Sequence, residues 1–222
     1  MKKVLSLLLC VMLILMVSAC GEAEKTPTTT TPQKTEAPAV DYTPYKAKIE
    51  EYATALQMDE DAFFQTYGEP DCSSINGNAL MLVYPWEGTI SYARHDVDGN
   101  GVEELLFSDW TSIIDVYTLK DGNVIKLYED CDFGYRTLLH ITPKGEMVIQ
   151  WGNAFEGNLE VGKLNTDGTV VEKVAAYYVV DITGATPDRE DAQLVSEEEF
   201  LALAEQYGES IFDTLTWTKI KR

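Results

Sequence analysis

Residues 95–107, HDVDGNGVEELLF, carry oxygen-bearing side chains at regular intervals. Counted from the first aspartate, candidate ligands stand at offsets 1, 3, 5 and 9, with a backbone carbonyl at offset 7: Asp96, Asp98, Asn100, Glu104 and Val102. Gly101 stands at offset 6, where a loop that folds around an ion must turn sharply. An all-oxygen set suits Ca²⁺ better than Mg²⁺, which prefers few carboxylates and several waters. The spacing therefore predicts one Ca²⁺ site, and the alternative is a polar hairpin turn without an ion.

The segments on either side of this acidic loop (residues 96–104) are typical of strands. Residues 89–95, TISYARH, alternate in polarity, and LLFSDW follows at 105–110. Offset 12 is Phe107, which cannot coordinate a cation as the last ligand of an EF-hand does. The unit resembles the strand–loop–strand calcium hairpins of FG-GAP/VCBS repeats, as in integrin α-chain propellers. It is also similar to a module of bacterial lipoproteins with DIDGDGIPELL-like sequences. The resemblance implies calcium binding through the same five offsets.

Glycines recur at a fixed interval through the middle of the chain. Gly99, Gly122, Gly145 and Gly168 are 23 residues apart, and Gly77 lies 22 residues before the first. Most have polar neighbours, and β-rich runs such as IIDVYTL and VIKLYE flank them, which is typical of hairpin turns. We therefore predict an antiparallel β-meander of hairpins. Only the first turn carries the full ligand set, because the fourth has Asn165, Asp167, Thr169 and Lys173 at the equivalent positions.

Helices are predicted on both sides of the meander. Thr43 can cap a first helix, with Pro44 in its first turn, and Asp59 can cap a second over 60–67. Ser196 and Glu199 form a capping-box pattern for a helix that ends at Gly208, and TLTWTKI at 214–220 predicts a final strand. The predicted fold class is α+β: a β-meander flanked by N-terminal helices and one C-terminal helix.

The N-terminus predicts export and lipid anchoring. A basic start, MKK, precedes an apolar run of about 21 Å as a helix, shorter than the roughly 30 Å that a membrane span requires. Residues 17–20, VSAC, resemble the lipobox of bacterial lipoproteins, which implies a signal peptide over 1–19 and lipidation of Cys20. An ordinary secretory signal is the alternative. Residues 20–43 are rich in Thr and Pro and predict a disordered tether, followed by a single domain over 44–222.

Charge and cysteine content agree with an extracytoplasmic location at the cell membrane. The chain has a net charge of −20, which disfavours nucleic acid as a partner and attracts divalent cations. Cys72 and Cys131 are the only cysteines of the predicted domain. They could form one disulfide in an oxidising compartment, or they could remain two free thiols.

Catalytic patterns are weak. The chain has two histidines and lacks G-x-S-x-G, H-E-x-x-H and phosphate-binding glycine loops, so we predict a protein that is not an enzyme. Trp86, Trp110 and Trp151 could stack on a ligand such as a sugar, although aromatic residues in a meander commonly pack in the core.

The sequence thus favours a cell-surface lipoprotein with a calcium-stabilised binding or interaction domain. The lipid anchor would attach the protein to the membrane, and its ligand could be a glycan, a peptide or a protein. The alternatives are a solute- or glycan-binding lipoprotein for uptake, a secreted hydrolase with two facing carboxylates, and a purely structural envelope protein.

Overall fold

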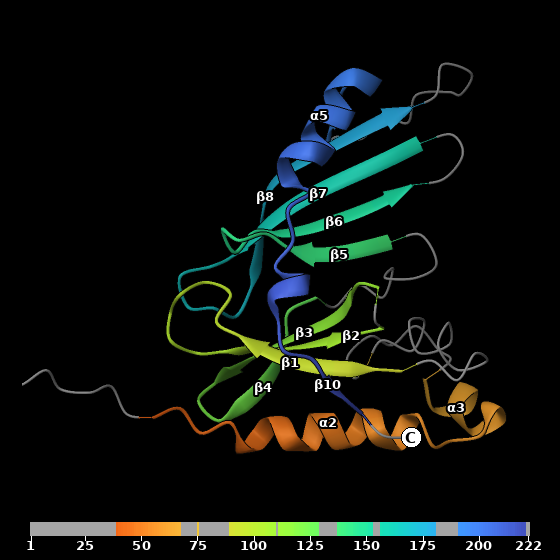
Figure 1. Cartoon of the computed structure of the whole chain (residues 1–222), viewed down its shortest axis with the longest axis vertical. Coiled ribbons are helices and arrows are strands. Elements are labelled where there is room, and N and C mark those ends of the chain that lie inside the picture. The colour runs from red at the N-terminus through yellow and green to blue at the C-terminus, as the bar shows by residue number, and fades with distance from the viewer. Residues whose placement is uncertain are drawn as a thin grey trace, which may run out of the picture. The chain divides into compact units, whose positions relative to one another are not determined.

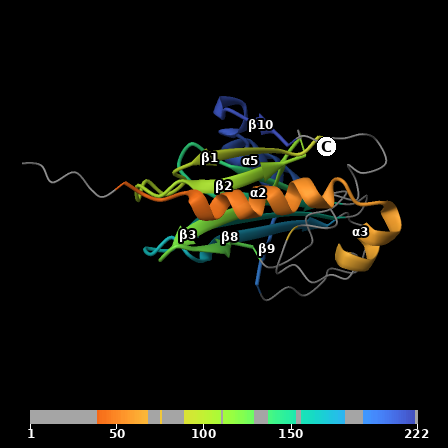
Figure 2. The ribbon, with the colours of Figure 1, turned by 90° about the horizontal axis from the view of Figure 1, so that it is seen from below.

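The computed structural model describes residues 39–67, 75, 89–109, 111–128, 137–152, 156–180 and 191–220. Residues Val40–Arg222 form one compact unit, whose arrangement is shown in Figures 1 and 2. The predicted signal peptide, most of the tether, and the three cysteines Cys20, Cys72 and Cys131 lie outside the described residues. Among the described residues, no helix combines the length and the apolarity needed to cross a membrane.

Two helices precede the sheet. Helix α2 spans Thr43–Ala55 and α3 spans Glu60–Tyr67. Asp59 caps α3 as predicted, since its Oδ1 accepts the Ala62 N–H at 2.8 Å. The prediction that Thr43 caps α2 is wrong, because Thr43 is the first helical residue and its own N–H donates to Asp41 Oδ1 at 2.9 Å. The carboxylate two residues earlier supplies the acceptor that the first turn requires.

A ten-stranded mixed sheet with a few helices around it forms the body of the domain, which is broadly consistent with the predicted α+β class. Its strands are β1 (Ser91–His95), β2 (Glu104–Ser108), β3 (Ile113–Lys120), β4 (Asn123–Lys126), β5 (Thr137–Ile141), β6 (Met147–Gly152), β7 (Glu156–Leu164), β8 (Val171–Val180), β9 (Gln193–Leu194) and β10 (Thr218–Lys219). The strand order is β10-β1-β2-β3-β5-β6-β7-β8-β9, with β4 paired to β3. Unlike the other pairs, β8 and β9 are parallel.

Each of the four regularly spaced glycines lies between two paired strands. Their φ angles are +74° at Gly99, +77° at Gly122, +72° at Gly145 and +71° at Gly168, all in the left-handed region that favours glycine. These turns connect β1 to β2, β3 to β4, β5 to β6 and β7 to β8. These four glycines therefore lie in hairpin turns, as the sequence predicted.

Alternating strand residues divide the core into three clusters. The first packs α2 and α3 against β2 and β3, through residues such as Tyr52 and Phe107, whose rings stack with centroids 3.8 Å apart. The second takes the intervening residues Leu106 and Val116 and joins them to β5 and β6. The third packs Phe200 of α5 (Glu197–Tyr207) against β6, β7 and β8. Figure 1 shows α2 and α5 at opposite ends of the sheet.

The C-terminal segment runs from α5 back to the first strand. The predicted capping box of α5 is confirmed, with the Glu199 N–H donating to Ser196 Oγ and the Ser196 N–H donating to Glu199 Oε2. The predicted strand over 214–220 is largely wrong: Phe212–Thr214 form a 3-10 helix, and only β10 is a strand. The Trp217 indole N–H donates to the Phe212 carbonyl at 3.0 Å, which folds this stretch onto itself.

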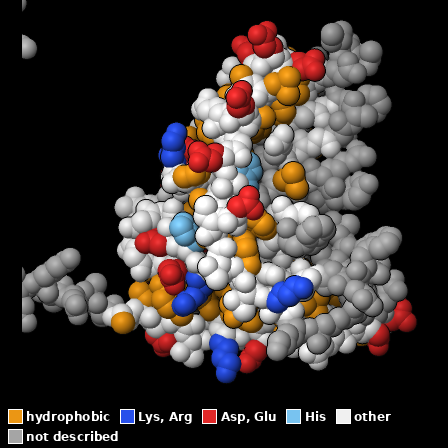
Figure 3. Space-filling view, in the orientation of Figure 1, with side chains coloured by type: hydrophobic (Ala, Val, Ile, Leu, Met, Phe, Trp, Pro, Cys, Tyr) orange, Lys and Arg blue, Asp and Glu red, His pale blue; other side chains and the backbone are white. Residues whose placement is uncertain are grey.

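Acidic side chains dominate the charged surface in the view of Figure 3. Asp and Glu side chains are spread over this face, while Lys and Arg side chains stand as separate small groups. This distribution is consistent with the net charge of −20.

Candidate metal-binding loop

The acidic loop connects two neighbouring antiparallel strands. Strand β1 ends at His95 and β2 begins at Glu104, and these two residues pair with each other across the ladder. The ladder thus fixes both ends of the loop. Figure 1 shows the loop at the same end of the sheet as the turn between β7 and β8.

Three of the predicted ligands converge. Carboxylate oxygens of Asp96, Asp98 and Glu104 lie within 4.8 Å of one another. Backbone groups of the loop hold two of these side chains in place, because the Gly101 N–H donates to Asp96 Oδ2 and the Asn100 N–H donates to Asp98 Oδ1, at 2.9 and 3.0 Å. A turn formed by side chain–backbone hydrogen bonds therefore presents the carboxylates together.

Glu104 differs from the other two because its side chain is fully buried. Its Oε2 accepts the Val97 N–H at 2.9 Å and its Oε1 accepts the Thr118 hydroxyl at 3.0 Å. The pKa of the Glu104 carboxyl is raised to about 7. Burial is the main cause and the charge of Asp98 adds to it, while the two hydrogen bonds act in the opposite direction. An ionised carboxylate at this depth is unfavourable without a nearby positive charge.

The residues present fit a hard divalent cation. Asp96 Oδ1 is buried and has no hydrogen-bond partner among the described residues, so one buried carboxylate oxygen is available for coordination. Asn100 Oδ1 accepts the Val102 N–H at 2.6 Å and retains a second lone pair. All of these atoms are oxygens, which suit calcium or magnesium better than zinc. Such an ion would offset the mutual repulsion of the three carboxylates.

Two other hairpin turns pack directly against the acidic loop. A Cβ built on Gly168, in the turn between β7 and β8, would lie 2.8 Å from Asn100 Nδ2 and 3.2 Å from Asp98 Oδ2. A Cβ on Gly145, between β5 and β6, would lie 2.2 Å from the Val97 carbonyl oxygen. The absence of side chains at these two positions is therefore what lets the turns approach the loop.

Helix α2 fixes the far end of the loop through Glu103. The Glu103 N–H donates to the Tyr42 hydroxyl at 2.9 Å, and the Tyr45 hydroxyl donates to the Glu103 carbonyl at 2.9 Å. The guanidinium of Arg94 lies 4.6 Å from the centre of the Tyr42 ring and pairs with the Glu103 carboxylate at 3.5 Å. These contacts hold Glu103, the residue before Glu104, and do not involve the Glu104 carboxylate.

The other predicted site residues are not part of this loop. Trp151 lies in β6 and lines a separate pocket, while Trp86 and Trp110 lie outside the described residues. Of the two histidines, His95 ends β1, and His140 Nε2 is 2.7 Å from the Tyr207 carbonyl oxygen, where it joins β5 to the end of α5. Both histidines thus lie in strands of the sheet, His95 in β1 and His140 in β5.

Sequence reasoning missed the partners that surround the ligands. Thr118, Tyr42 and Tyr45 contact the loop or its end, but they come from β3 and α2 or the residue before it. Their spacing carries no local signal, because these contacts depend on how distant elements pair.

Comparisons with known proteins give no relative for this chain: no family model, curated protein or solved structure matches it.

Proposed function

We propose that this chain is a lipid-anchored protein on the outer side of the cell membrane, whose domain holds one Ca²⁺ ion in the acidic loop and acts as a binding or interaction module. The observation that supports it best is the convergence of three carboxylates within 4.8 Å around an unpartnered Asp96 oxygen. The donor atoms would come from Asp96, Asp98, Asn100, Val102 and Glu104. The ion would supply positive charge that stabilises the loop, so its role is structural.

The hairpin turns support a related proposal about the fold. We infer that the four glycine turns belong to one repeated unit of about 23 residues, in an antiparallel meander, of which only the first turn kept a full ligand set. The supporting facts are the constant spacing and the shared positive φ angles. In this interpretation, the other three turns lost the full ligand set and kept the positive φ of the glycine.

Calcium titration of the full-length protein in detergent tests the metal site. We expect heat of binding and a higher melting temperature with about 10 mM Ca²⁺ than with chelator, since extracellular sites of this kind bind at ~10⁻⁴–10⁻³ M. Asp98→Ala should abolish both effects. The matched control is Asp167→Ala in the fourth turn, which should leave the calcium response intact. An identical melting temperature with calcium and with chelator would reject the site.

Membrane fractionation tests the anchor separately. Cys20→Ser should release the protein from the membrane fraction, because the acyl chains would have no attachment point. Continued membrane association of this variant would contradict lipidation at Cys20.

A solute- or glycan-binding protein is the second candidate. One observation favours it: Trp151, the described member of the three predicted stacking residues, lines a pocket.

A further inference from the structure

A pocket of about 310 Å³ lies on strands β5 to β8, away from the acidic loop. We call it the Trp151 pocket, and the residues that matter for its chemistry are Tyr128, Thr137, Ile149, Trp151, Glu160 and Lys173. Its volume is at the small end of the range found for small-molecule sites and corresponds to roughly ten water molecules. It therefore has room for one compact ligand.

The strand register explains why these residues share one face. Thr137 pairs with Trp151 across β5 and β6, and Ile149 pairs with Glu160 across β6 and β7. Residues paired in this way, or two apart on one strand, point to the same side of a sheet. A Cβ on the neighbouring Gly162 would lie 2.4 Å from Val171 Cγ1 and 3.5 Å from the Tyr128 hydroxyl, so the glycine keeps this part of the pocket open.

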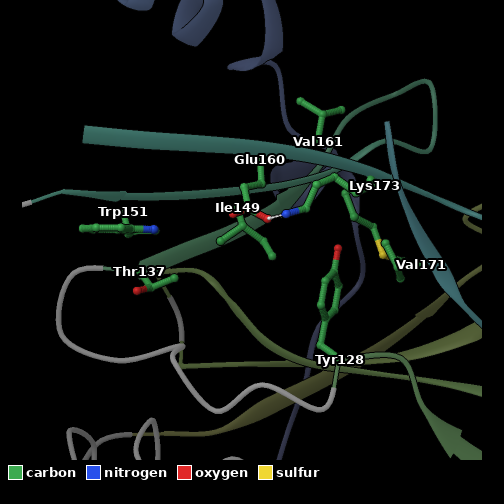
Figure 4. A pocket seen from close by; sticks show the side chains of 10 residues that line it. Tyr128, Thr137, Ile149, Trp151, Glu160, Val161, Val171 and Lys173 are labelled. Atoms are coloured by element: carbon green, nitrogen blue, oxygen red, sulfur yellow. Dashed lines mark ion pairs between the residues drawn. The ribbon is translucent and has the colours of Figure 1, made fainter. Parts of the chain in front are cut away.

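Two aromatic rings form opposite walls. Figure 4 shows Trp151 and Tyr128 on opposite sides of the pocket, with Ile149 between them and the nitrogen-bearing edge of Trp151 turned inward. Neither the Trp151 indole N–H nor the Thr137 hydroxyl has a hydrogen-bond partner among the described residues. Burial raises the pKa of the Tyr128 hydroxyl well above its usual value, which keeps it protonated. The pocket thus combines apolar ring faces with neutral polar groups.

One wall carries an ion pair with a net negative charge. Lys173 Nζ lies 3.3 Å from Glu160 Oε2 and 3.2 Å from Asp191 Oδ2, so one cation serves two carboxylates. A phosphate or carboxylate ligand would be repelled by this arrangement. A hydroxyl group would not, because it can donate to a carboxylate oxygen and accept from an ammonium group at the same time.

We infer that the Trp151 pocket binds one ring of a neutral sugar. The apolar face of the ring would pack on the Trp151 indole, and its hydroxyls would exchange hydrogen bonds with the Glu160–Lys173 pair and with Thr137. The inference rests on the proposed role as a binding module but is independent of the acidic loop. A quaternary ammonium ion is the other chemistry that aromatic walls attract. It is disfavoured because a quaternary ammonium group has no N–H to donate and no lone pair to accept, so it could not exchange hydrogen bonds with Thr137 or with the Glu160–Lys173 pair.

Ligand-observed NMR with the full-length protein in detergent tests this assignment. The probes are glucose, galactose and N-acetylglucosamine as neutral sugars, glucose 6-phosphate as the anionic analogue, and choline as the cation. We expect saturation transfer to the ring C–H groups of at least one neutral sugar and weaker transfer to the phosphate. Trp151→Ala should weaken that binding at least about tenfold. Glu160→Gln, which is nearly isosteric, should weaken it as well.

Trp217→Phe is the matched control, since Trp217 packs against Phe212 with ring centroids 4.9 Å apart and does not line the pocket. It should leave sugar binding unchanged. Choline binding without sugar binding would overturn the assignment, as would no binding of any probe, or undiminished sugar binding by both pocket variants. Running each titration with calcium and with chelator separates the two proposals, because the calcium response is read from the heat of binding and the melting temperature, and the sugar response from saturation transfer.

Discussion

The first and fourth hairpin turns share a glycine frame but satisfy their polar side chains differently. In the fourth turn, Asn165 Oδ1 accepts the N–H groups of Thr169 and Val170 at 2.9 and 3.1 Å. Asp167 accepts from Thr169 and pairs with Lys120 at 3.5 Å. Every acidic group in that turn thus has a donor or a cation beside it.

The first turn has more negative charge than its own donors neutralise. Three carboxylates meet there, one of them is fully buried, and an oxygen of Asp96 has no partner among the described residues. At the position equivalent to Glu104, the fourth turn has Lys173, which pairs with Glu160. Two turns with the same positive-φ glycine can therefore differ in what they require: the fourth is satisfied by its own donors and Lys120, whereas the first has a buried oxygen and carboxylates that a cation would satisfy.

The largest expected effect comes from separating the acidic loop from its neighbouring turn. Gly145→Ala places a methyl group 2.2 Å from the Val97 carbonyl oxygen at a φ of +72°. Backbone strain and overpacking together should lower the free energy of unfolding by about 2–5 kcal/mol. Urea denaturation of the full-length protein measures the change.

Gly122→Ala is the matched control for that substitution. It has a similar φ of +77° but no atom within 4 Å of the added Cβ, so only the strain of about 1–2 kcal/mol should remain. Equal losses at Gly122 and Gly145 would show that contact with the acidic loop is unimportant.

The next largest effect concerns the buried charge of the first turn. Glu104→Gln keeps the shape, and the amide can accept the Val97 N–H and donate to the Thr118 hydroxyl in place of the present bonds. The calcium response should be lost, which for a dissociation constant of ~10⁻³ M and about 10 mM Ca²⁺ amounts to about 1.4 kcal/mol. Calorimetric melting with calcium and with chelator measures it.

In chelator, the same substitution should raise the melting temperature, because it removes an acidic group that is costly to bury. A variant that still gains stability from calcium would show that Glu104 is not a ligand.

A smaller effect is expected in the fourth turn. Asn165→Ala removes the acceptor of two backbone N–H groups and should lower the free energy of unfolding by about 1 kcal/mol. The loss should be the same with calcium and with chelator, since the two hydrogen bonds that are removed involve none of the proposed metal ligands. A loss seen only in calcium would mean that the fourth turn contributes to the metal site.

The smallest effect concerns the acid response of Asp167. The hydrogen bond from the Thr169 hydroxyl, aided by Lys120, lowers the pKa of this exposed carboxyl, so its contribution is present above the ordinary Asp value of about 3.9 and lost as the pH falls through the lowered pKa. Asp167→Asn should be slightly less stable than the unchanged protein near about pH 6 and equal to it near about pH 2. Urea midpoints at both pH values test this, and a difference that grows on acidification would contradict it.

Local features of the fold were predictable from sequence because their physical causes are local. The glycine of each turn needs a positive φ, the Ser196–Glu199 box caps its own helix, and the start of α3 follows from its cap, Asp59. The choice of candidate ligands rested on the same kind of information, since all five belong to one loop.

Contacts between distant residues could not be predicted in this way. Nothing near Glu104 in the sequence indicates that Thr118 will meet its carboxylate, or that Gly168 will approach Asp98. The strand expected over 214–220 failed for a related reason: TLTWTKI alternates as a strand does, but only Thr218 and Lys219 pair with β1, while the Trp217 indole donates to the Phe212 carbonyl. The parallel pairing of β8 and β9 is likewise a contact between residues distant in the sequence, Tyr177 with Gln193 and Tyr178 with Leu194.

The C-terminal segment bridges β3 and β5, the neighbouring strands with the fewest paired residues among those the structure describes. Among the described residues, β3 meets β5 at the single pair Ile113 and Leu139, whereas β7 and β8 are paired along nearly their whole lengths. The Ile211 N–H donates to the Ile141 carbonyl on one side of that junction, and the Ile220 N–H donates to the Ile90 carbonyl on the other, both at 2.9 Å.

Residues 211–220 follow every other helix and strand that the structure describes. Strands β1–β4 and β5–β8 already meet without this stretch, in the second core cluster and where the turns at Gly145 and Gly168 pack on the acidic loop. During synthesis on the ribosome, the hydrogen bonds of Ile211 and Ile220 across the β3–β5 junction are therefore the last connection to form. A nascent chain stalled before residue 211 would lack this connection, and we expect it to be more open to proteases than the complete domain.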